Sequence, residues 1–293
     1  MRNQLTPEIR AETLIEALPF LQKFRGQTFV IKYGGSAMDD QQQVDRLLRD
    51  IVFLEAVGIN PVVVHGGGKA ITSRMREAGL TPRFVQGLRV TDAQSIEIVQ
   101  TTLDDAVNPR IVQTIRDFGG RALGLSGTTV FEAKKIAPQR IEDGTLQDLG
   151  FVGEVAKVSA RVIRQAIRAE QVPVISPIGA DTSGVVFNIN ADIAAAGLAT
   201  ALRASKLVYI SDVPGIMRNP KAPDSLIPTV TAEQVQVLIK EKVIDGGMIP
   251  KVQSAVEALK KGVAKIHFIN GALPHGLLLE IFTNAGVGTE IVA

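Results

Sequence analysis

The chain of 293 residues contains no cysteine and no tryptophan, and aromatic residues make up only 4% of it. The absence of cysteine excludes disulfides, thiol nucleophiles and zinc–thiolate sites, and it fits a reducing cytoplasm. So few aromatic side chains argue against platforms on which nucleic-acid bases stack. Lysine and arginine (32 residues) nearly balance aspartate and glutamate (30 residues), so no excess charge attracts nucleic acid or an anionic membrane. We therefore expect neither as a partner.

Long hydrophobic runs are also missing. The most apolar stretch, 189–202, is interrupted by Asn190 and Asp192 and is too short to span a bilayer. The first residues include Arg2 and Glu8 and lack the apolar core of a signal peptide. We expect a soluble cytoplasmic protein, whose 45% hydrophobic residues suffice for a large core.

Two glycine clusters follow two short apolar segments that we expect to be strands. Lys-Tyr-Gly-Gly-Ser (32–36) comes after 28–31, and His-Gly-Gly-Gly-Lys (65–69) comes after 61–64. Ligands bind beyond the carboxyl ends of parallel strands, where glycines expose backbone N–H groups and a following helix attracts anions. Glycines can also serve only to make tight turns. Two such clusters, one with Lys32, favour a phosphate site.

Neither standard glycine motif for nucleotide binding is satisfied. The segment 66–70 lacks the upstream glycine and the hydroxyl residue of a P-loop, and no G-x-G-x-x-G sequence opens a helix after a strand. A P-loop NTPase and a Rossmann dehydrogenase are therefore disfavoured. His65, His267 and His275 are too scattered to indicate a metal site. We interpret His267, which lies in an apolar strand, as structural.

Apolar strands alternate with amphipathic helices from residue 28 onward, which predicts a mostly parallel sheet with helices on both faces. Strands are expected at 28–31, 62–64, 122–125, 172–176, 206–210 and 265–269, and helices at 44–51, from 91 onward and at 252–259. Two segments break the alternation: 128–158, which we interpret as a β-hairpin, and a proline-containing loop at 219–228. Two lobes are expected to join near 177–184.

The segment 7–24 predicts an amphipathic helix outside this alternation. Thr6 is a capping residue and Pro7 stands at the first helical position. Pro19 falls inside the helical pattern and predicts a kink or a break. Pro109 similarly threatens the continuity of the helix that begins near residue 91.

Six ordered motifs resemble those of the amino-acid kinase family. The family-level motifs are Lys32-Tyr33-Gly34-Gly35, Val64-His65-Gly66-Gly67-Gly68 and Ser211-Asp212-Val213-Pro214-Gly215. Segments 86–91, 187–192 and 246–251 are more specifically similar to the acetylglutamate kinases of that family, with Gln86 in place of a common asparagine. The similarity runs from about residue 28 to the carboxyl end. It implies an α/β fold, a three-layer αβα sandwich with a mostly parallel central sheet, here preceded by the N-terminal kinked helix.

The resemblance implies transfer of the γ-phosphoryl group of ATP to the side-chain carboxylate of N-acetyl-L-glutamate in arginine biosynthesis. Mg²⁺ would arrive on the ATP phosphates rather than in a protein cage. The residues suit this reaction, because a carboxylate is ionised at neutral pH and needs no general base. Alternatives are another family member, such as carbamate kinase, aspartokinase or glutamate 5-kinase, or a non-catalytic amino-acid sensor. The presence of Lys32, Asp192 and Lys251 argues against a sensor.

The resemblance also assigns roles to single residues. The catalytic residues would be Lys32, which bridges acceptor and phosphoryl group, Lys251, which acts from the nucleotide side, and Asp192, which orients both lysines. The substrate-binding residues would be Gly67, Gly68, Arg89 and Asn188, with Arg89 clamping the α-carboxylate in a bidentate fashion. The nucleotide-binding residues would be Gly34, Gly35, Ser211, Asp212 and Gly215. Simpler interpretations are solvated lysines, a first-turn acid at Asp192 and a surface ion pair at Arg89.

The carboxyl-terminal segment resembles that of arginine-sensitive, hexameric family members. The implied L-arginine site consists of His275, Glu280, Gly286 and Gly288, with Glu280 paired to the guanidinium group. The apolar stripe of the N-terminal helix would contact the same helix of another subunit, in a hexamer built as a trimer of dimers. Alternatively, that helix packs on its own subunit and the Gly-Val-Gly turn only ends a strand.

The expected organisation is an oligomerisation helix at 1–25, an acceptor lobe at 26–180 and a nucleotide lobe with the arginine-site element at 181–293. Some relatives in photosynthetic organisms bind the nitrogen-regulatory PII protein. The sequence does not decide whether this chain does.

Overall fold

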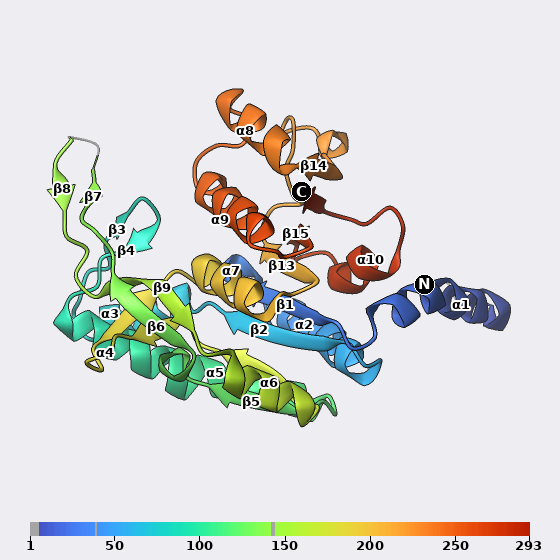
Figure 1. Ribbon diagram of the computed structural model, residues 1–293, viewed down its shortest axis with the longest axis horizontal. Helices are drawn as coiled ribbons and strands as arrows, with labels where there is room; N and C mark the ends of the chain where they lie inside the picture. Colours follow the sequence, from blue (N-terminus) through green and yellow to red (C-terminus); the bar gives the residue numbers. More distant parts are fainter. Residues whose placement is uncertain (1–5, 39, 142–143) are drawn as a thin grey trace.

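The computed structural model describes residues 6–38, 40–141 and 144–293, and it has the expected three-layer αβα architecture (Figure 1). The central sheet has the strand order β14-β16-β15-β13-β1-β2-β10-β5. Its strands are β1 (Thr28–Tyr33), β2 (Asn60–His65), β5 (Ala122–Leu125), β10 (Val172–Ile175), β13 (Lys206–Ser211), β14 (Thr229–Thr231), β15 (Lys265–Asn270) and β16 (Thr289–Val292). The six strands from β15 to β5 are parallel, and β16 pairs antiparallel with β15, so the prediction of a mostly parallel sheet is confirmed.

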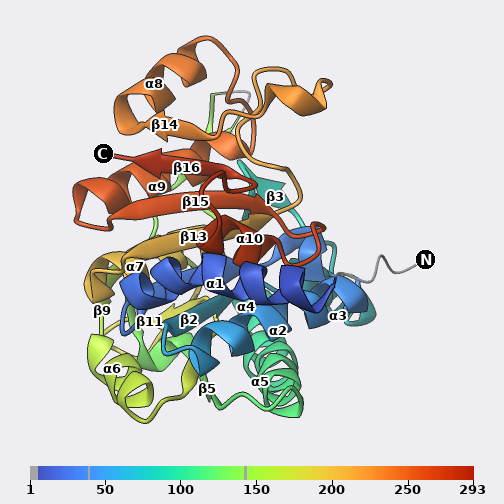
Figure 2. The ribbon, with the colours of Figure 1, turned by 90° about the vertical axis from the view of Figure 1, so that its right-hand side faces the viewer.

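Helices cover both faces of this sheet. One face carries α1 (Pro7–Phe24), α2 (Gln41–Ala56), α5 (Asn108–Asp117) and α10 (Gly276–Phe282), and the other carries α6 (Ala160–Arg168), α7 (Ala191–Leu202), α8 (Ala232–Lys240) and α9 (Met248–Lys260). Figure 2 shows α1, α2 and α10 in front of the strands. Alternate residues of β1 supply the two cores, since Phe29 and Ile31 pack towards α2 while Val30 packs towards α7.

A second sheet is a closed four-stranded barrel of β11 (Ile178–Ala180), β12 (Val186–Ile189), β9 (Val152–Val158) and β6 (Phe131–Lys135). The antiparallel pairing of β6 with β9 confirms the predicted hairpin. Strands β11 and β12 were not predicted, because each is too short to show an alternating pattern. Strand β11 lies within the segment 177–184 expected to join the two lobes, and β12 lies just beyond it, so this sheet contains residues from both sides of position 180.

Two small hairpins, β3 (Phe84–Val85) with β4 (Leu88–Arg89) and β7 (Gln139–Arg140) with β8 (Leu146–Gln147), project beyond the sheets (Figure 1). The remaining elements are α3 (Gly68–Glu77), α4 (Ala93–Thr102), the π-helical turn η2 (Leu103–Val107) and the 3₁₀ turns η1 (Gly35–Met38), η3 (Gly127–Thr129) and η4 (Pro223–Ser225). No helix of the described chain is both long and apolar enough to cross a membrane.

The breaks predicted at Pro19 and Pro109 are not found, because the chain remains helical at both residues. Helix α1 begins at the Thr6 cap and continues through Pro19, where the hydrogen bond that proline cannot make is lost on an exposed side of the helix. Pro109 lies in the first turn of α5, which continues from α4 through the π-helical turn. The π-helical turn accommodates the proline: the N–H group of Asn108 donates to the carbonyl of Leu103, five residues back, and the next residue, Pro109, has no N–H group to pair.

The outer part of α1 presents apolar side chains to solvent. Leu14 and Ile15 are 70% and 66% exposed, whereas Phe24 is buried and Phe20 packs against the core beside it. The helix extends past the rest of the molecule (Figure 1). Within one subunit, the predicted apolar stripe is therefore only partly covered.

Candidate active site

The carboxyl ends of β1, β2 and β13 lie at the same edge of the sheet, because β1 pairs in parallel with both neighbours. The two glycine clusters meet there. The N–H group of Gly66 donates a hydrogen bond to the carbonyl of Tyr33 at 2.6 Å. A Cβ atom on Gly34 would lie 3.2 Å from both Gly66 Cα and Lys32 Nζ. Glycine is needed at Gly34 because backbone and amine come so close.

Lys32 and Asp192 form an ion pair at this edge. Lys32 Nζ lies 3.1 Å from Asp192 Oδ1, and both side chains are almost completely buried. Asp192 stands in the first turn of α7, where the Asn190 side chain accepts a hydrogen bond from its N–H group at 2.8 Å. Among the described residues, no donor is well aligned with Asp192 Oδ1. The carboxylate therefore complements the helix dipole and keeps an oxygen available to a further donor.

Lys251 shares a cavity with Asp192. This cavity, of about 950 Å³, is lined on one side by Asp192 and by Lys251 from the first turn of α9, and on the other by Gln86 and Gln139 from the two small hairpins. Asp192 thus contacts Lys32 directly and faces the same space as Lys251. The three predicted catalytic residues are therefore brought to one region.

The amino-terminal end of α3 opens into a second, adjoining hollow of about 150 Å³. Gly67 is the N-cap and has no side chain to accept the first N–H groups of the helix, which are available to an anion. A Cβ atom on Gly67 would lie 2.5 Å from Leu103 Cδ2. Gly67, Gly68, Arg89 and Asn188, the four predicted substrate-binding residues, all line this hollow.

Arg89 is held by the helix and by an aromatic ring. Its Nη2 donates to the carbonyl of Gly68 and to Thr72 Oγ1, each at 2.9 Å, and its guanidinium lies 4.6 Å from the centre of the Phe84 ring. Burial lowers the pKa of Arg89, although a guanidinium stays charged in proteins. Arg89 is 94% buried and forms no ion pair with any residue that the structure describes, so the interpretation as a surface ion pair is wrong. The arrangement fixes the orientation of a planar cation at one end of the hollow.

Thr91 links Arg89 to Asn188, and the sequence analysis did not assign it a role. Its hydroxyl donates to the carbonyl of Arg89 at 2.8 Å and accepts from Asn188 Nδ2 at 3.3 Å. Thr91 is completely buried. The only sequence signal is its place at the end of the motif 86–91.

The side chain of His65 packs beside the second glycine cluster and hydrogen-bonds to it. Its Nδ1 lies 2.8 Å from the carbonyl of Gly66, and its Nε2 lies 3.1 Å from Asn108 Nδ2. Burial lowers the pKa of His65 to about 4, so the ring is neutral near pH 7. Asn108 is a donor at Nδ2, so His65 carries its proton on Nδ1 and donates it to Gly66.

The predicted nucleotide-binding residues are more dispersed. Gly34 contacts Lys32, and Gly35 adopts φ +74° at the start of η1. Ser211 ends β13, beside β1, and its hydroxyl lies 3.2 Å from Asp212 Oδ1. Gly215 packs against the end of the chain, since a Cβ atom there would come within 2.4 Å of Thr289 Oγ1. In the described part of the chain, no group of three or more His, Cys, Asp or Glu side chains could hold a metal ion.

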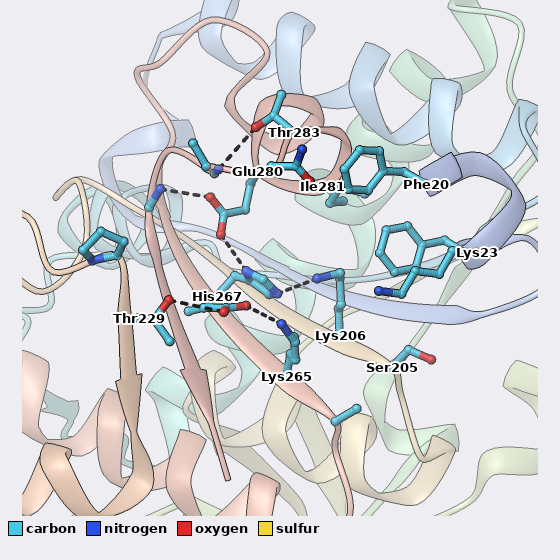
Figure 3. A pocket seen from close by; sticks show the side chains of 18 of the residues that line it. Phe20, Lys23, Ser205, Lys206, Thr229, Lys265, His267, Glu280, Ile281 and Thr283 are labelled. Atoms are coloured by element: carbon cyan, nitrogen blue, oxygen red, sulfur yellow. Dashed lines mark hydrogen bonds and ion pairs between the residues drawn. The ribbon is translucent and has the colours of Figure 1, made fainter. Parts of the chain in front are cut away.

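A separate cavity of about 460 Å³ lies between α1 and the carboxyl-terminal segment (Figure 3). Glu280, Gly286 and Gly288 line it together with Lys23 of α1. His275, the fourth residue of the predicted arginine site, does not belong to this lining. Its Nδ1 lies 2.6 Å from the buried carboxyl group of Asp50, on α2.

A buried chain of polar groups forms one wall of this cavity (Figure 3). Lys206 Nζ lies 2.8 Å from His267 Nε2, and His267 Nδ1 lies 2.6 Å from Glu280 Oε1. The other oxygen of Glu280 accepts from the N–H groups of Val287 and Gly288 at 2.7 and 2.9 Å. Burial lowers the pKa of His267, and burial also lowers the pKa of Lys206 to about 8. Burial opposes ionisation of Glu280, but the hydrogen bonds from His267 and the loop outweigh it and lower its pKa.

Two acetylglutamate kinases are similar to this chain over nearly its whole length. An acetylglutamate kinase from Akkermansia muciniphila is 50% identical over 284 residues, which cover 97% of this chain and 95% of that protein. An acetylglutamate kinase from Methanocaldococcus jannaschii is 47% identical, with 96% of each chain covered.

Solved structures share the fold. The N-acetylglutamate synthase from Neisseria gonorrhoeae complexed with coenzyme A and N-acetyl-glutamate superposes with a TM-score of 0.83 at 30% identity, covering 97% of this chain. This chain spans only 63% of that synthase. Carbamate kinase from Giardia, at 18% identity and a TM-score of 0.65, shows the same fold over 91% of this chain and 99% of its own. Residues 27–270 match the model of the amino acid kinase family, and the chain therefore belongs to this family.

Proposed function

We propose that this protein transfers the γ-phosphoryl group of ATP to the side-chain carboxylate of N-acetyl-L-glutamate, forming N-acetyl-L-glutamyl 5-phosphate for arginine biosynthesis in the cytoplasm. The observation that carries this proposal is the adjacency of two features. The buried Lys32–Asp192 pair lies at the sheet edge where the glycine clusters meet, and Arg89 is fixed in the hollow at the open end of α3. Similarity to acetylglutamate kinases over nearly the whole chain supports the choice of acceptor.

The acceptor would lie along the hollow that Gly67 and Arg89 line. Arg89 and Asn188 would bind its α-carboxylate, because a guanidinium fork suits a planar carboxylate. Its side-chain carboxylate would then extend towards the first N–H groups of α3 and towards Lys32. That carboxylate is already ionised near pH 7, so the reaction needs alignment and charge neutralisation rather than a base.

Charge that spreads over the transferring phosphoryl group would be neutralised from two sides. Lys32 and the N–H groups of Gly67 and Gly68 would act from the acceptor side, and Lys251 would act from the nucleotide side. Asp192 would orient both lysines. ATP would bring Mg²⁺ on its phosphates and bind near Ser211, Asp212 and Gly215 of the second lobe, with its phosphates close to Gly34 and Gly35 of the first.

An assay of ADP release tests the acceptor. We expect turnover with N-acetyl-L-glutamate to exceed that with glutamate, aspartate or carbamate by orders of magnitude. Preference for carbamate or for unacetylated glutamate would instead assign the chain to one of the other kinase activities. No turnover with any acceptor would support a sensor that kept the fold.

We also propose that L-arginine inhibits the enzyme by binding in the cavity between α1 and α10. Glu280 supplies a buried carboxylate for a guanidinium group, and Gly286 and Gly288 let the backbone approach the ligand. The Neisseria gonorrhoeae synthase complexed with coenzyme A and L-arginine has a TM-score of 0.80 at 27% identity. Calorimetric titration tests the site: arginine should bind the wild-type protein, and Glu280→Ala should abolish binding without loss of catalysis.

A further inference from the structure

Two hairpins form one wall of the cavity that contains Asp192 and Lys251. Gln86 of the β3–β4 turn and Gln139 of β7 line this wall, opposite α9. Figure 1 draws the two hairpins next to each other, away from the body of the central sheet. The β3–β4 hairpin ends with Arg89, so its position sets the main chain from which this guanidinium reaches α3.

The bases of the hairpins are joined by main-chain hydrogen bonds. The N–H group of Thr91 donates to the carbonyl of Leu149 at 2.9 Å, and the N–H group of Phe151 donates to the carbonyl of Thr91 at 2.6 Å. Gly150 lies between them at φ +75°, and a Cβ atom there would lie 2.2 Å from the Thr91 carbonyl oxygen. The two hairpins therefore share a fixed base.

The outer ends of the hairpins are joined by a side chain. Gln86 Nε2 donates to the carbonyl of Arg140 at 2.8 Å, across 54 positions of sequence. Gln86 adopts φ +48°, a left-handed conformation that glycine and asparagine accept far more readily than glutamine does. A glutamine is thus held in an unfavourable backbone conformation where its side chain is long enough to reach the neighbouring hairpin.

We propose that Gln86 is a positioning residue for the acceptor: its hydrogen bond to Arg140 makes β3–β4 and β7–β8 a single wall that holds Arg89 in place. The inference rests on the proposed function for the identity of the acceptor. When the hydrogen bond from Gln86 to Arg140 is removed, the hairpins remain joined only at Thr91, and the β3–β4 turn moves independently of β7–β8. Arg89, three residues beyond Gln86, then samples orientations that do not match a bound carboxylate.

Two substitutions remove the hydrogen bond to Arg140 while changing the backbone preference in different ways. Gln86→Met keeps the length of the side chain but cannot donate. Gln86→Asn suits the left-handed conformation better but is one methylene too short. Loss of one exposed hydrogen bond of this kind changes an equilibrium constant about two- to tenfold. Both variants should raise the KM for N-acetyl-L-glutamate by that factor, with kcat and the KM for ATP changed less than twofold.

Amide hydrogen exchange gives a readout that does not depend on the reaction. In the protein without substrates, both variants should exchange faster at 84–90 and at 139–141, with the rest of the chain unchanged. Gln113→Met is the matched control, because Gln113 is an exposed glutamine on α5 whose Nε2 donates to Asp117 Oδ1 at 2.7 Å, within one helix. It should alter neither kinetics nor exchange in the hairpins.

Three results would overturn the proposal. Unchanged exchange in Gln86→Met would show that the hydrogen bond does not couple the hairpins. A Gln86→Asn variant with wild-type exchange and KM would show that only the backbone turn matters. Faster exchange together with an unchanged acceptor KM would show that the coupling does not position Arg89. If N-acetyl-L-glutamate proved not to be the substrate, the exchange experiment would still test whether Gln86 couples the two hairpins.

Discussion

At the scale of single residues, the site brings two lysine side chains close to one aspartate, which partly neutralises their positive charge. Lys32 is buried against Asp192, and Lys251 lines the same cavity as this carboxylate. Both lysines should act on charge that develops during transfer, and such interactions affect kcat. We expect Lys32→Ala and Lys251→Ala each to lower kcat about a hundredfold, roughly 3 kcal/mol.

Steady-state kinetics measures these losses, with acceptor binding followed separately by calorimetry. The KM for N-acetyl-L-glutamate should change much less than kcat. Lys240→Ala, at an exposed position near the end of α8, provides the control and should behave as wild type. A nearly normal kcat in either active-site variant would remove that lysine from the catalytic group.

Thr91 carries the second prediction at this scale, because its buried hydroxyl connects the side chain of Asn188 to the main chain of Arg89. Thr91→Val removes the hydrogen bonds to the carbonyl of Arg89 and from Asn188 while keeping the side-chain volume. A lost buried hydrogen bond is worth about 1–3 kcal/mol. We expect the acceptor KM to rise about tenfold in Thr91→Val and to stay within threefold of wild type in Thr91→Ser. Equal effects of the two variants would point to packing instead of the hydroxyl.

At the scale of elements, the sequence predicted those helices and strands that are determined by residues close together in the chain. The apolar strands, the Thr6 cap and the hairpin around β6 and β9 are encoded in short segments, and all are found. The barrel was missed because β11 and β12 are short and acquire strand geometry only by pairing with β6 and β9. The link from Asn188 to Thr91 spans 97 positions and could not be inferred without the register of the barrel.

The prediction that Pro109 interrupts its helix was wrong for a reason that concerns the site. The chain continues through a π-helical turn, and Leu103 of that turn packs against Gly67. Gly67→Ala should therefore displace the open end of α3 and lower kcat/KM at least tenfold. The obstructing atom belongs to a side chain, so Gly67→Ala combined with Leu103→Ala should recover part of this loss.

Kinetics and thermal unfolding together test this coupling. Leu103→Ala alone should cost about 2–5 kcal/mol of stability, since it leaves a cavity in a buried position. The effects of the two substitutions should then be less than additive, as expected for residues in contact. Strictly additive losses would show that the π-helical turn does not support the glycine cluster.

At the scale of the whole molecule, we propose that the exposed part of α1 joins the subunits of a hexamer. Leu14 and Ile15 lie well away from Phe20 and Phe24, which anchor the helix to its own subunit. The double variant Leu14→Glu/Ile15→Glu should reduce a hexamer to dimers in light scattering while catalytic activity is retained. Glu12→Gln, on the same helix, should leave the particle mass unchanged. A wild-type protein that is already dimeric would refute the proposed assembly.

The polar chain behind the arginine cavity makes effector binding depend on pH. Lys206 faces His267 and Glu280 and is influenced by Lys265, Glu290 and Lys23, and burial lowers its pKa to about 8. Below pH 8 its positive charge opposes a guanidinium beside Glu280. Above pH 8 the amine is neutral, while the guanidinium remains charged and Glu280 remains ionised. The dissociation constant of arginine should therefore fall about five- to tenfold as the pH rises from 6.5 to 9, the size of a screened interaction of about 1 kcal/mol.

Calorimetric titrations of wild type and Lys206→Met at several pH values test this sign. Lys206→Met has no charge to lose at this position, so its affinity should match that of the wild type at high pH and exceed it at low pH. The α-amino group of arginine also titrates in this range. It does so with both proteins, so the difference between their profiles isolates Lys206. If both proteins showed the same profile, Lys206 would not be the titrating group. If affinity decreased as the pH rose in the wild type alone, Lys206 would titrate but its charge would favour arginine, and the predicted sign would be wrong.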